Sequence, residues 1–252
     1  MLPPLVSENL ATLAGALAAV SLSLLEWLRP NVPYPLSWNW YARALGLAAA
    51  GIVLTALTGN GFEALFHGAR AWPAVSAALN QRPAWLAGFC GYLGVTLVVY
   101  WWHRARHASD LLWRVFHQIH HSPNRLQAFT AFYAHPIDFM LNTVIVNLVA
   151  YAVLGLSVEG AVWAAIWTNL FDLWEHTNVR TPRWLGFIVV RPEMHRVHHE
   201  SDVHAKNYGI PLWDMLFGTF ENSHRQVPAC GFTPEREQRL LAMLGFRDLH
   251  KS

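Results

Sequence analysis

Four long stretches of the chain contain no Asp, Glu, Lys or Arg, and polar segments separate them. They are residues 9–25, 44–62, 83–102 and 139–158. Each is close to the ~20 residues that a helix needs to cross a hydrocarbon core of about 30 Å, so each predicts a transmembrane helix. A fifth apolar run, residues 160–171, is shorter and continues into Asp172, Glu175 and His176. It can span only if its last turns leave the lipid or face a polar interior.

The segments 103–138 and 177–252 are too polar to face lipid, yet they contain several aromatic residues. Aromatic side chains favour the membrane interface, so these segments predict a cap at the membrane face. Residues 183–190 fit either an interfacial helix or a short strand. The run Thr233-Pro234-Glu235 has the cap, proline and acid of a helix start, which predicts an amphipathic tail helix continuing through residues 239–244.

Composition places the chain among integral membrane proteins. Of the 252 residues, 54% are hydrophobic and only 13% are charged, against about 25% charged residues in an average soluble domain. The mean hydropathy is +0.22. A net charge of +2 is too small to suggest nucleic-acid binding. Cys90 and Cys230 are too few to hold an iron–sulfur cluster, and we do not expect them to pair with each other.

The positions of Lys and Arg predict the orientation of these spans. The start of the chain, residues 1–9, lacks positive charge, so the first span is expected to be retained rather than cleaved as a signal peptide. With five spans, residues 63–82 form an external loop in which His67 is expected to be solvated. Only Arg70 and Arg82, of the 18 basic residues, then lie outside. This positive-inside asymmetry predicts that the cap is cytosolic.

Fourteen histidines are the unusual feature of the composition, and eight of them form three short clusters. His103 and His107 are four residues apart at the end of the third span. The triplets His117, His120, His121 and His195, His198, His199 share one spacing. Offsets of three and four place side chains on one face of a helix, so each cluster is expected to present its imidazoles in one direction.

Clustered neutral imidazoles are typical of metal sites. Eight histidines are too many for one structural zinc, which is closed by four ligands. They predict two metals, each with several imidazoles and an open position. Soluble helical di-iron proteins use mainly glutamates with two histidines, so they are a poor template for this chain.

The histidine clusters and the residues around them resemble those of a known family. The runs Tyr100-Trp101-Trp102-His103-Arg104-Ala105-Arg106-His107, Phe116-His117-Gln118-Ile119-His120-His121 and His195-Arg196-Val197-His198-His199 are similar to the three histidine boxes of the fatty acid hydroxylase and sterol desaturase superfamily. Lys206-Asn207-Tyr208-Gly209 and a run at residues 213–219 add to the similarity, which covers residues 90 to 221.

The resemblance implies an all-α integral membrane enzyme with about five transmembrane helices and a cytosolic helical cap that holds a His-rich dimetal site. It implies two iron ions, dioxygen as co-substrate, a membrane lipid substrate and an external redox protein as electron donor; zinc could replace iron in a purified sample. Residues 1–82 then form N-terminal spans, residues 83–224 the catalytic domain and residues 225–252 a tail. The expected location is a membrane, such as a bacterial inner membrane, with the metals on the cytosolic face.

The family also carries histidines at places that match His135 and His176, so both are expected as metal ligands. Asp172 lies one turn before His176 and is a candidate to orient it. Asn207 and Asp214 complete the candidate catalytic set. Asn207 is expected to support the third box as part of a turn, and Asp214 is expected to pair with an arginine or a ligand histidine nearby. His204 stays open, while His224 and His250 are expected at the solvated surface.

Several functions remain open at this stage. Hydroxylation of a membrane lipid or acyl chain is the first choice, and oxidation of a sterol or carotenoid by hydroxylation or desaturation is the alternative. A His-rich metal transporter is a distant alternative. Transport sites lie near the bilayer midplane on broken helices, whereas these histidines are expected at one membrane face. A membrane protein with a structural zinc is a further alternative, and a closed metal site of four ligands would favour that alternative.

Overall fold

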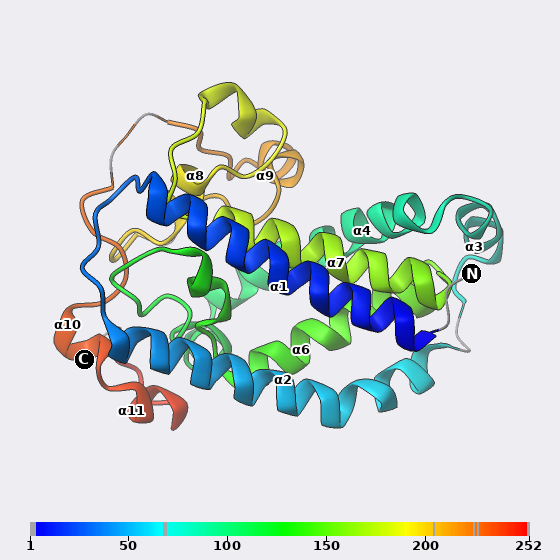
Figure 1. Cartoon of the computed structure of the whole chain (residues 1–252), viewed down its shortest axis with the longest axis horizontal. Coiled ribbons are helices and arrows are strands. Elements are labelled where there is room, and N and C mark those ends of the chain that lie inside the picture. Colours follow the sequence, from blue (N-terminus) through cyan, green and yellow to red (C-terminus); the bar gives the residue numbers. More distant parts are fainter. Residues whose placement is uncertain (1–3, 68–69, 204, 224, 226, 251–252) are drawn as a thin grey trace.

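The computed structural model is helical throughout (Figure 1), and it describes residues 4–67, 70–203, 205–223, 225 and 227–250, without side chains for 4–12, 58–64 and 67. Within these residues the only β-type pairing is an isolated bridge between Glu200 and Cys230. The α-helices are α1 (Pro4–Leu28), α2 (Trp38–His67), α3 (Pro73–Asn80), α4 (Ala84–Ala108), α5 (Asp110–Leu112), α6 (Pro136–Asn147), α7 (Val158–Glu175), α8 (Pro192–His198), α9 (Pro211–Phe217), α10 (Pro234–Glu237) and α11 (Leu240–Leu244). Two π-helices, η1 (Trp113–His117) and η3 (Leu148–Val153), and two 3₁₀-helices, η2 (Ala128–Phe132) and η4 (Arg183–Phe187), connect them.

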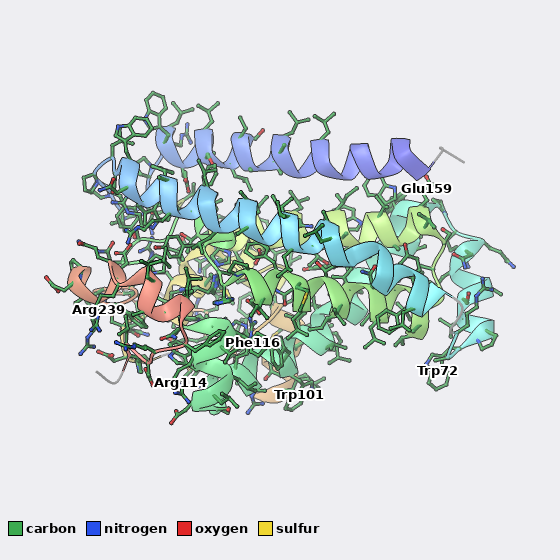
Figure 2. All side chains as sticks on the ribbon, turned by 90° about the horizontal axis from the view of Figure 1, so that it is seen from below. Trp72, Trp101, Arg114, Phe116, Glu159 and Arg239 are labelled. Atoms are coloured by element: carbon green, nitrogen blue, oxygen red, sulfur yellow. The ribbon has the colours of Figure 1, made fainter. Side chains whose placement is uncertain are left out.

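Five long helices lie roughly side by side, and a cap of short helices and loops covers one end. In Figure 1, α1 runs along α7 and α2 runs along α6, while α4 packs against α7. The helices α6 and α7 touch each other only sparsely. Figure 2 shows Trp72 and Glu159 at the far end of the bundle and Arg239 at the capped end.

Three helices are long and apolar enough to cross a membrane: Trp38–Leu57, Ala84–Ala108 and Pro136–Val153, the last including η3. They match the second, third and fourth predicted spans. The described apolar part of α1, Leu13–Leu28, is shorter, and α7 is not among the three.

The expected external loop at residues 63–82 contains the end of α2 and all of α3, whose first turn Pro73 can occupy. One prediction about local structure was wrong. The expected tail helix is divided into α10 and α11, and Arg239, which lies between them, leaves helical geometry at ψ 43°. Residues 183–190, left open between helix and strand, begin with the 3₁₀-helix η4. Cys90 and Cys230 are both free, as expected.

Polar contacts attach the long helices to the cap. Glu26, near the end of α1, is buried, and its Oε2 accepts hydrogen bonds from the backbone N–H groups of Ala128 (3.0 Å) and Asn178 (3.1 Å). The start of α2 is held by apolar contacts, since Trp40 packs in one core with Met243 and Leu249 of the tail. The cap therefore rests on both N-terminal helices.

The crossing of α4 and α7 depends on Gly88, and this predicts a specific sensitivity. A Cβ at Gly88 would lie 2.4 Å from the Cβ of Trp163 and 2.8 Å from the backbone N of Ala164. We expect Gly88→Ala to lower the free energy of unfolding by about 1–3 kcal/mol, since the close helices must separate. Gly46→Ala is the matched control, because nothing lies within 4 Å of its added Cβ. Thermal unfolding of both variants in detergent tests this, and equal midpoints would contradict the account.

Candidate metal centre

The first histidine box lies on the last two turns of α4, where the helix reaches the cap. His103 and His107 are one turn apart and their rings lie 5.2 Å from each other. The Nδ1 of His103 is 2.7 Å from the backbone oxygen of Tyr208. The apolar sequence of α4 thus sets the direction of the helix, and its polar end delivers both rings to the site.

The second and third boxes lie on short irregular elements. His117 ends the π-helix η1, and His120 and His121 follow in a turn. His195 and His198 lie on α8, and His199 caps it. π-Helical turns are rare and are often found at functional sites.

Nine histidines gather into two groups of potential metal ligands. The first group contains five residues: His103, His107, His117, His121 and His198. The second contains four: His120, His176, His195 and His199. Within each group the nearest ligand atoms all lie within 4.8 Å of one another. The stacked rings of His121 and His199, with centroids 4.1 Å apart, bring the two groups into contact.

Each triplet contributes to both groups, although its three ring centroids stay within 5.5 Å of one another and so face the same site. The second box sends His117 and His121 to the first group and His120 to the second, while the third box sends His195 and His199 to the second and His198 to the first. On a helix the residues at offsets three and four lie on either side of the starting residue. The H-x-x-H-H spacing therefore reaches two neighbouring centres from one short segment.

The Nε2 atoms converge at distances typical of ligands on one metal. The Nε2–Nε2 distances are 3.1 Å for His117–His121 and His121–His198, 3.3 Å for His120–His176, 2.9 Å for His176–His195 and 3.0 Å for His195–His199. At metal–nitrogen distances of about 2.1 Å, nitrogens at neighbouring coordination positions lie about 3.0 to 3.4 Å apart. The donor set and its spacing therefore fit metal ions.

Hydrogen bonds on the opposite ring nitrogens set the tautomers. The Nδ1 atoms of His103, His176 and His198 each lie 2.7 Å from a backbone oxygen, those of Tyr208, Asp172 and Lys206 respectively. A carbonyl oxygen only accepts, so Nδ1 carries the proton and Nε2 presents its lone pair. The Nε2 of His103 is buried with no hydrogen-bond partner among the described residues. Such a lone pair fits a metal ion.

The histidines are buried, and burial also keeps them uncharged. His121, His176, His198 and His199 are at most 1% exposed. Burial lowers the pKa of His117, His120, His195 and His199 well below the usual histidine value, and the mutual repulsion that protonated neighbouring histidines would feel adds to the effect. Neutral imidazole is the form that binds metal, so little proton release is needed.

The three candidate polar residues take supporting positions. The Nδ1 of His176 donates its hydrogen bond to the backbone oxygen of Asp172, while the Asp172 carboxylate lies 3.6 Å from the same Nδ1. The carboxylate of Asp214 accepts from the N–H groups of Tyr208 (2.9 Å) and Gly209 (3.2 Å) and from the Thr219 hydroxyl (2.6 Å). Asp214 thereby fixes the segment whose carbonyl oxygens orient His103 and His198.

Asn207 holds the same segment from its other side. Its side chain donates to the backbone oxygens of Met194 (2.9 Å) and Glu221 (3.0 Å) and accepts from the Glu221 N–H (2.8 Å). Its φ is +53°, a left-handed conformation that asparagine adopts more readily than most residues. Asn207 thus braces the loop against α8.

Sequence reasoning missed two features of the site. The Glu175 carboxylate lies 3.5 Å from Nδ1 of His195, and its only signal was its place next to His176. The carbonyl oxygens of Lys206 and Tyr208 are backbone atoms, which no residue pattern reveals.

The remaining histidines lie elsewhere. His135 caps α6, where its Nδ1 accepts from the Ile137 N–H (3.1 Å) and its Nε2 lies 3.4 Å from the Leu244 oxygen; neither group includes it. His250, expected at the solvated surface, is half-buried and packs against Trp113. His204 and His224 lie outside the described residues, as does the side chain of His67.

A cavity of about 510 Å³ leads from the histidines into the bundle between α4, α6 and α7. It is lined by members of both groups, among them His103 and His176. Farther along, Val95, Val146 and Val162 line it, and most of its wall is apolar. The site is therefore open to an elongated, largely apolar ligand.

Comparison with known proteins agrees with this geometry. A model of the fatty acid hydroxylase family matches residues 88–219, which include all nine histidines of the two groups. The ornithine lipid hydroxylase OlsE of Rhizobium tropici is 32% identical over 84% of this chain and 69% of its own length. No solved structure matches the chain.

Other relatives share a shorter region. Human alkylglycerol monooxygenase is 31% identical over 55% of this chain and 32% of its own length, so the chain spans about a third of that relative. The sphingolipid C4-hydroxylase sur2 of Schizosaccharomyces pombe is 28% identical over 51% of this chain and 46% of its own length. Together with the histidine geometry and the family match, these similarities show that the chain belongs to the fatty acid hydroxylase family.

Proposed function

We propose that this protein is a membrane oxidoreductase that uses two iron ions and dioxygen to hydroxylate a C–H bond of a lipid. The single observation that carries the proposal is the pair of adjoining imidazole groups at the end of an apolar cavity. The relatives are lipid hydroxylases and a monooxygenase by name, which supports the same reaction class.

In this proposal the nine histidines of the two groups hold the metals, and residues 83–224 form the catalytic region. When bound, the metals supply the redox chemistry that activates dioxygen. The chain itself orients the ligands through the Tyr208, Lys206 and Asp172 carbonyl oxygens. The buried walls of the site exclude water, and the cavity aligns the lipid with the centre.

The membrane arrangement is proposed from charge and length. The three apolar helices support membrane insertion, and we propose that α1 and α7 also cross it, giving five spans. The asymmetry of Lys and Arg supports a cytosolic cap, as in a bacterial inner membrane. Electrons then come from a separate redox protein that docks on the cap, since a nucleotide-binding fingerprint and a haem attachment motif are lacking in the sequence.

Comparative lipid mass spectrometry tests this function. Membrane lipids of cells that express the protein should contain a species heavier by one oxygen atom, and this species should be missing from cells without it. Cells expressing His199→Ala are the matched control and should resemble cells without the protein. A species lighter by two hydrogens would assign desaturation instead, and unchanged lipids in dioxygen-supplied cells with metal-loaded protein would contradict the proposal.

A further inference from the structure

A buried ion pair lines the cavity beside the histidines and takes no part in the metal groups. Arg106 lies one turn after His103 on α4, and Asp138 lies in the first turn of α6. Nη1 of Arg106 is 3.0 Å from Oδ1 and 2.9 Å from Oδ2 of Asp138. Both residues line the cavity, and their exposed fractions are only 5% and 3%.

The guanidinium of Arg106 lies over the ring of Trp102, at 5.7 Å from its centroid, but the pairing with Asp138 leaves some of its hydrogen-bond donors unused. Both contacts run through Nη1, and a fork-to-fork pair would use a second nitrogen. Nε is buried without a hydrogen-bond partner among the described residues, and no hydrogen bond of Nη2 is found there either. A buried donor without a partner costs about 1–3 kcal/mol, and more when it belongs to a charged group.

A second unused donor lies on the same wall. Asn142 is one turn beyond Asp138 on α6, about 6 Å farther along the helix axis. Its side chain lines the cavity and has no hydrogen bond to any described residue. Polar side chains within membrane-spanning helices are costly and usually serve function. By contrast, the cavity-lining Asn169 donates to the Ala165 oxygen (2.8 Å) of its own helix.

We propose that Arg106 and Asn142 bind the carbonyl oxygen of an uncharged acyl linkage, an amide or ester, in the lipid substrate. Arg106 offers only N–H donors, and Asn142 offers an NH2 donor beside its acceptor oxygen, so a ligand group that both side chains bind must be an acceptor. Asp138 already balances the charge of Arg106, and Asp172 and Glu175 add carboxylates to the same cavity. The arrangement favours a neutral carbonyl over the carboxylate of a free fatty acid.

This inference rests on the proposed function and names its substrate class: a lipid whose acyl chain is joined through an amide or ester. The apolar remainder of the cavity takes the hydrocarbon chain. Because Arg106 is one turn from His103, the carbonyl anchors the lipid close to the metals. Arg106 and Asn142 are therefore specificity-determining residues for the proposed reaction.

Lipid binding tests the inference without relying on oxidation. The metal-loaded full chain in nanodiscs is incubated with tritiated N-methylpalmitamide, and hexadecane and palmitate serve as unlabelled competitors. Binding of the amide should weaken about 3–10-fold in Asn142→Leu, which removes one neutral hydrogen bond of similar shape. It should weaken about 10–100-fold in Arg106→Lys, which keeps the charge but loses the planar donors.

Two comparisons keep the test specific. Asn169→Leu changes the same residue type in the same cavity and should leave amide binding within twofold of the wild type. Hexadecane, which has no acceptor, should compete equally well in the wild type and in Asn142→Leu. This second comparison shows whether weaker amide binding results from a lost hydrogen bond or from a change in the shape of the cavity.

The inference is overturned if palmitate competes at least as well as the amide in the wild type, or if Asn142→Leu and Asn169→Leu weaken amide binding equally. If lipid oxidation continues alongside either result, the proposed function is retained and only the assignment of the substrate class is rejected. Selective amide binding without any lipid oxidation would contradict the proposed function instead.

Discussion

Replacing His199 with alanine should reduce the bound metal from about two ions per chain to about one and should stop lipid oxidation. His199 belongs to the four-histidine group, so the variant leaves only three imidazoles there. Loss of a group that hydrogen-bonds to a metal-ligating histidine typically lowers metal affinity about 10–100-fold, and loss of the ligand itself should lower the affinity further. Metal content after dialysis, measured by elemental mass spectrometry, checks the result.

The neighbouring residue, His198, allows the metal loss of two single variants to be compared. His198 belongs to the five-histidine group, so His198→Ala leaves four imidazoles and should retain more metal than His199→Ala under the same dialysis. Lipid oxidation should still be lost, because both groups are needed. His135→Ala is the control and should keep both metals, since His135 caps α6 outside the two groups. A loss of metal in His135→Ala equal to that in His199→Ala would contradict the assignment.

The second large effect is expected at Asp214, which touches none of the histidine rings that it helps to position. Asp214→Ala removes the acceptor of the half-buried N–H groups of Tyr208 and Gly209 and of the Thr219 hydroxyl, which can still bond to the Tyr100 hydroxyl 2.8 Å away. At about 1–3 kcal/mol for each of the two N–H groups, the free energy of unfolding should fall by about 2 kcal/mol or more. Freed carbonyl oxygens would no longer orient His103 and His198, so metal affinity should fall about 10–100-fold.

Two measurements separate these consequences. Thermal unfolding reports the stability change, and metal titration well below the unfolding midpoint reports the affinity of the folded protein. Thr219→Val is the matched control, because it removes the hydroxyl bonds to Asp214 and Tyr100 and leaves the Tyr208 and Gly209 contacts in place. It should cost about 1 kcal/mol and change metal affinity little. Normal metal affinity in folded Asp214→Ala would show that the loop does not orient the ligands.

The sequence predicted the long helices well, because hydropathy over ~20 residues dominates their formation. Three of the four charge-free runs correspond to the spans of α2, α4 and the pair α6 and η3, and the first lies within α1. Short elements were harder to predict. A proline at a helix start explains α3, but the break between α10 and α11 depends on the local geometry of Arg239 rather than on composition.

The histidine boxes were recognisable because imidazoles at offsets of three and four are rare without a metal. How they divide between two centres was not predictable from spacing alone, since it depends on where α4, α8 and the turn after η1 meet. His135 did carry a local signal for its capping role, because Pro136 follows it at the first position of α6. The pairing of Arg106 with Asp138 joins residues 32 positions apart and left no trace in the sequence pattern.

Iron K-edge X-ray absorption on the purified, iron-loaded protein tests the central claim most directly. If nine imidazoles hold two ions, the spectrum should show a nitrogen shell near about 2.1 Å with the outer-shell scattering of four to five imidazoles per iron, at about two irons per chain. A first shell dominated by oxygen or sulfur, or a single iron per chain under saturating metal, would contradict the claim.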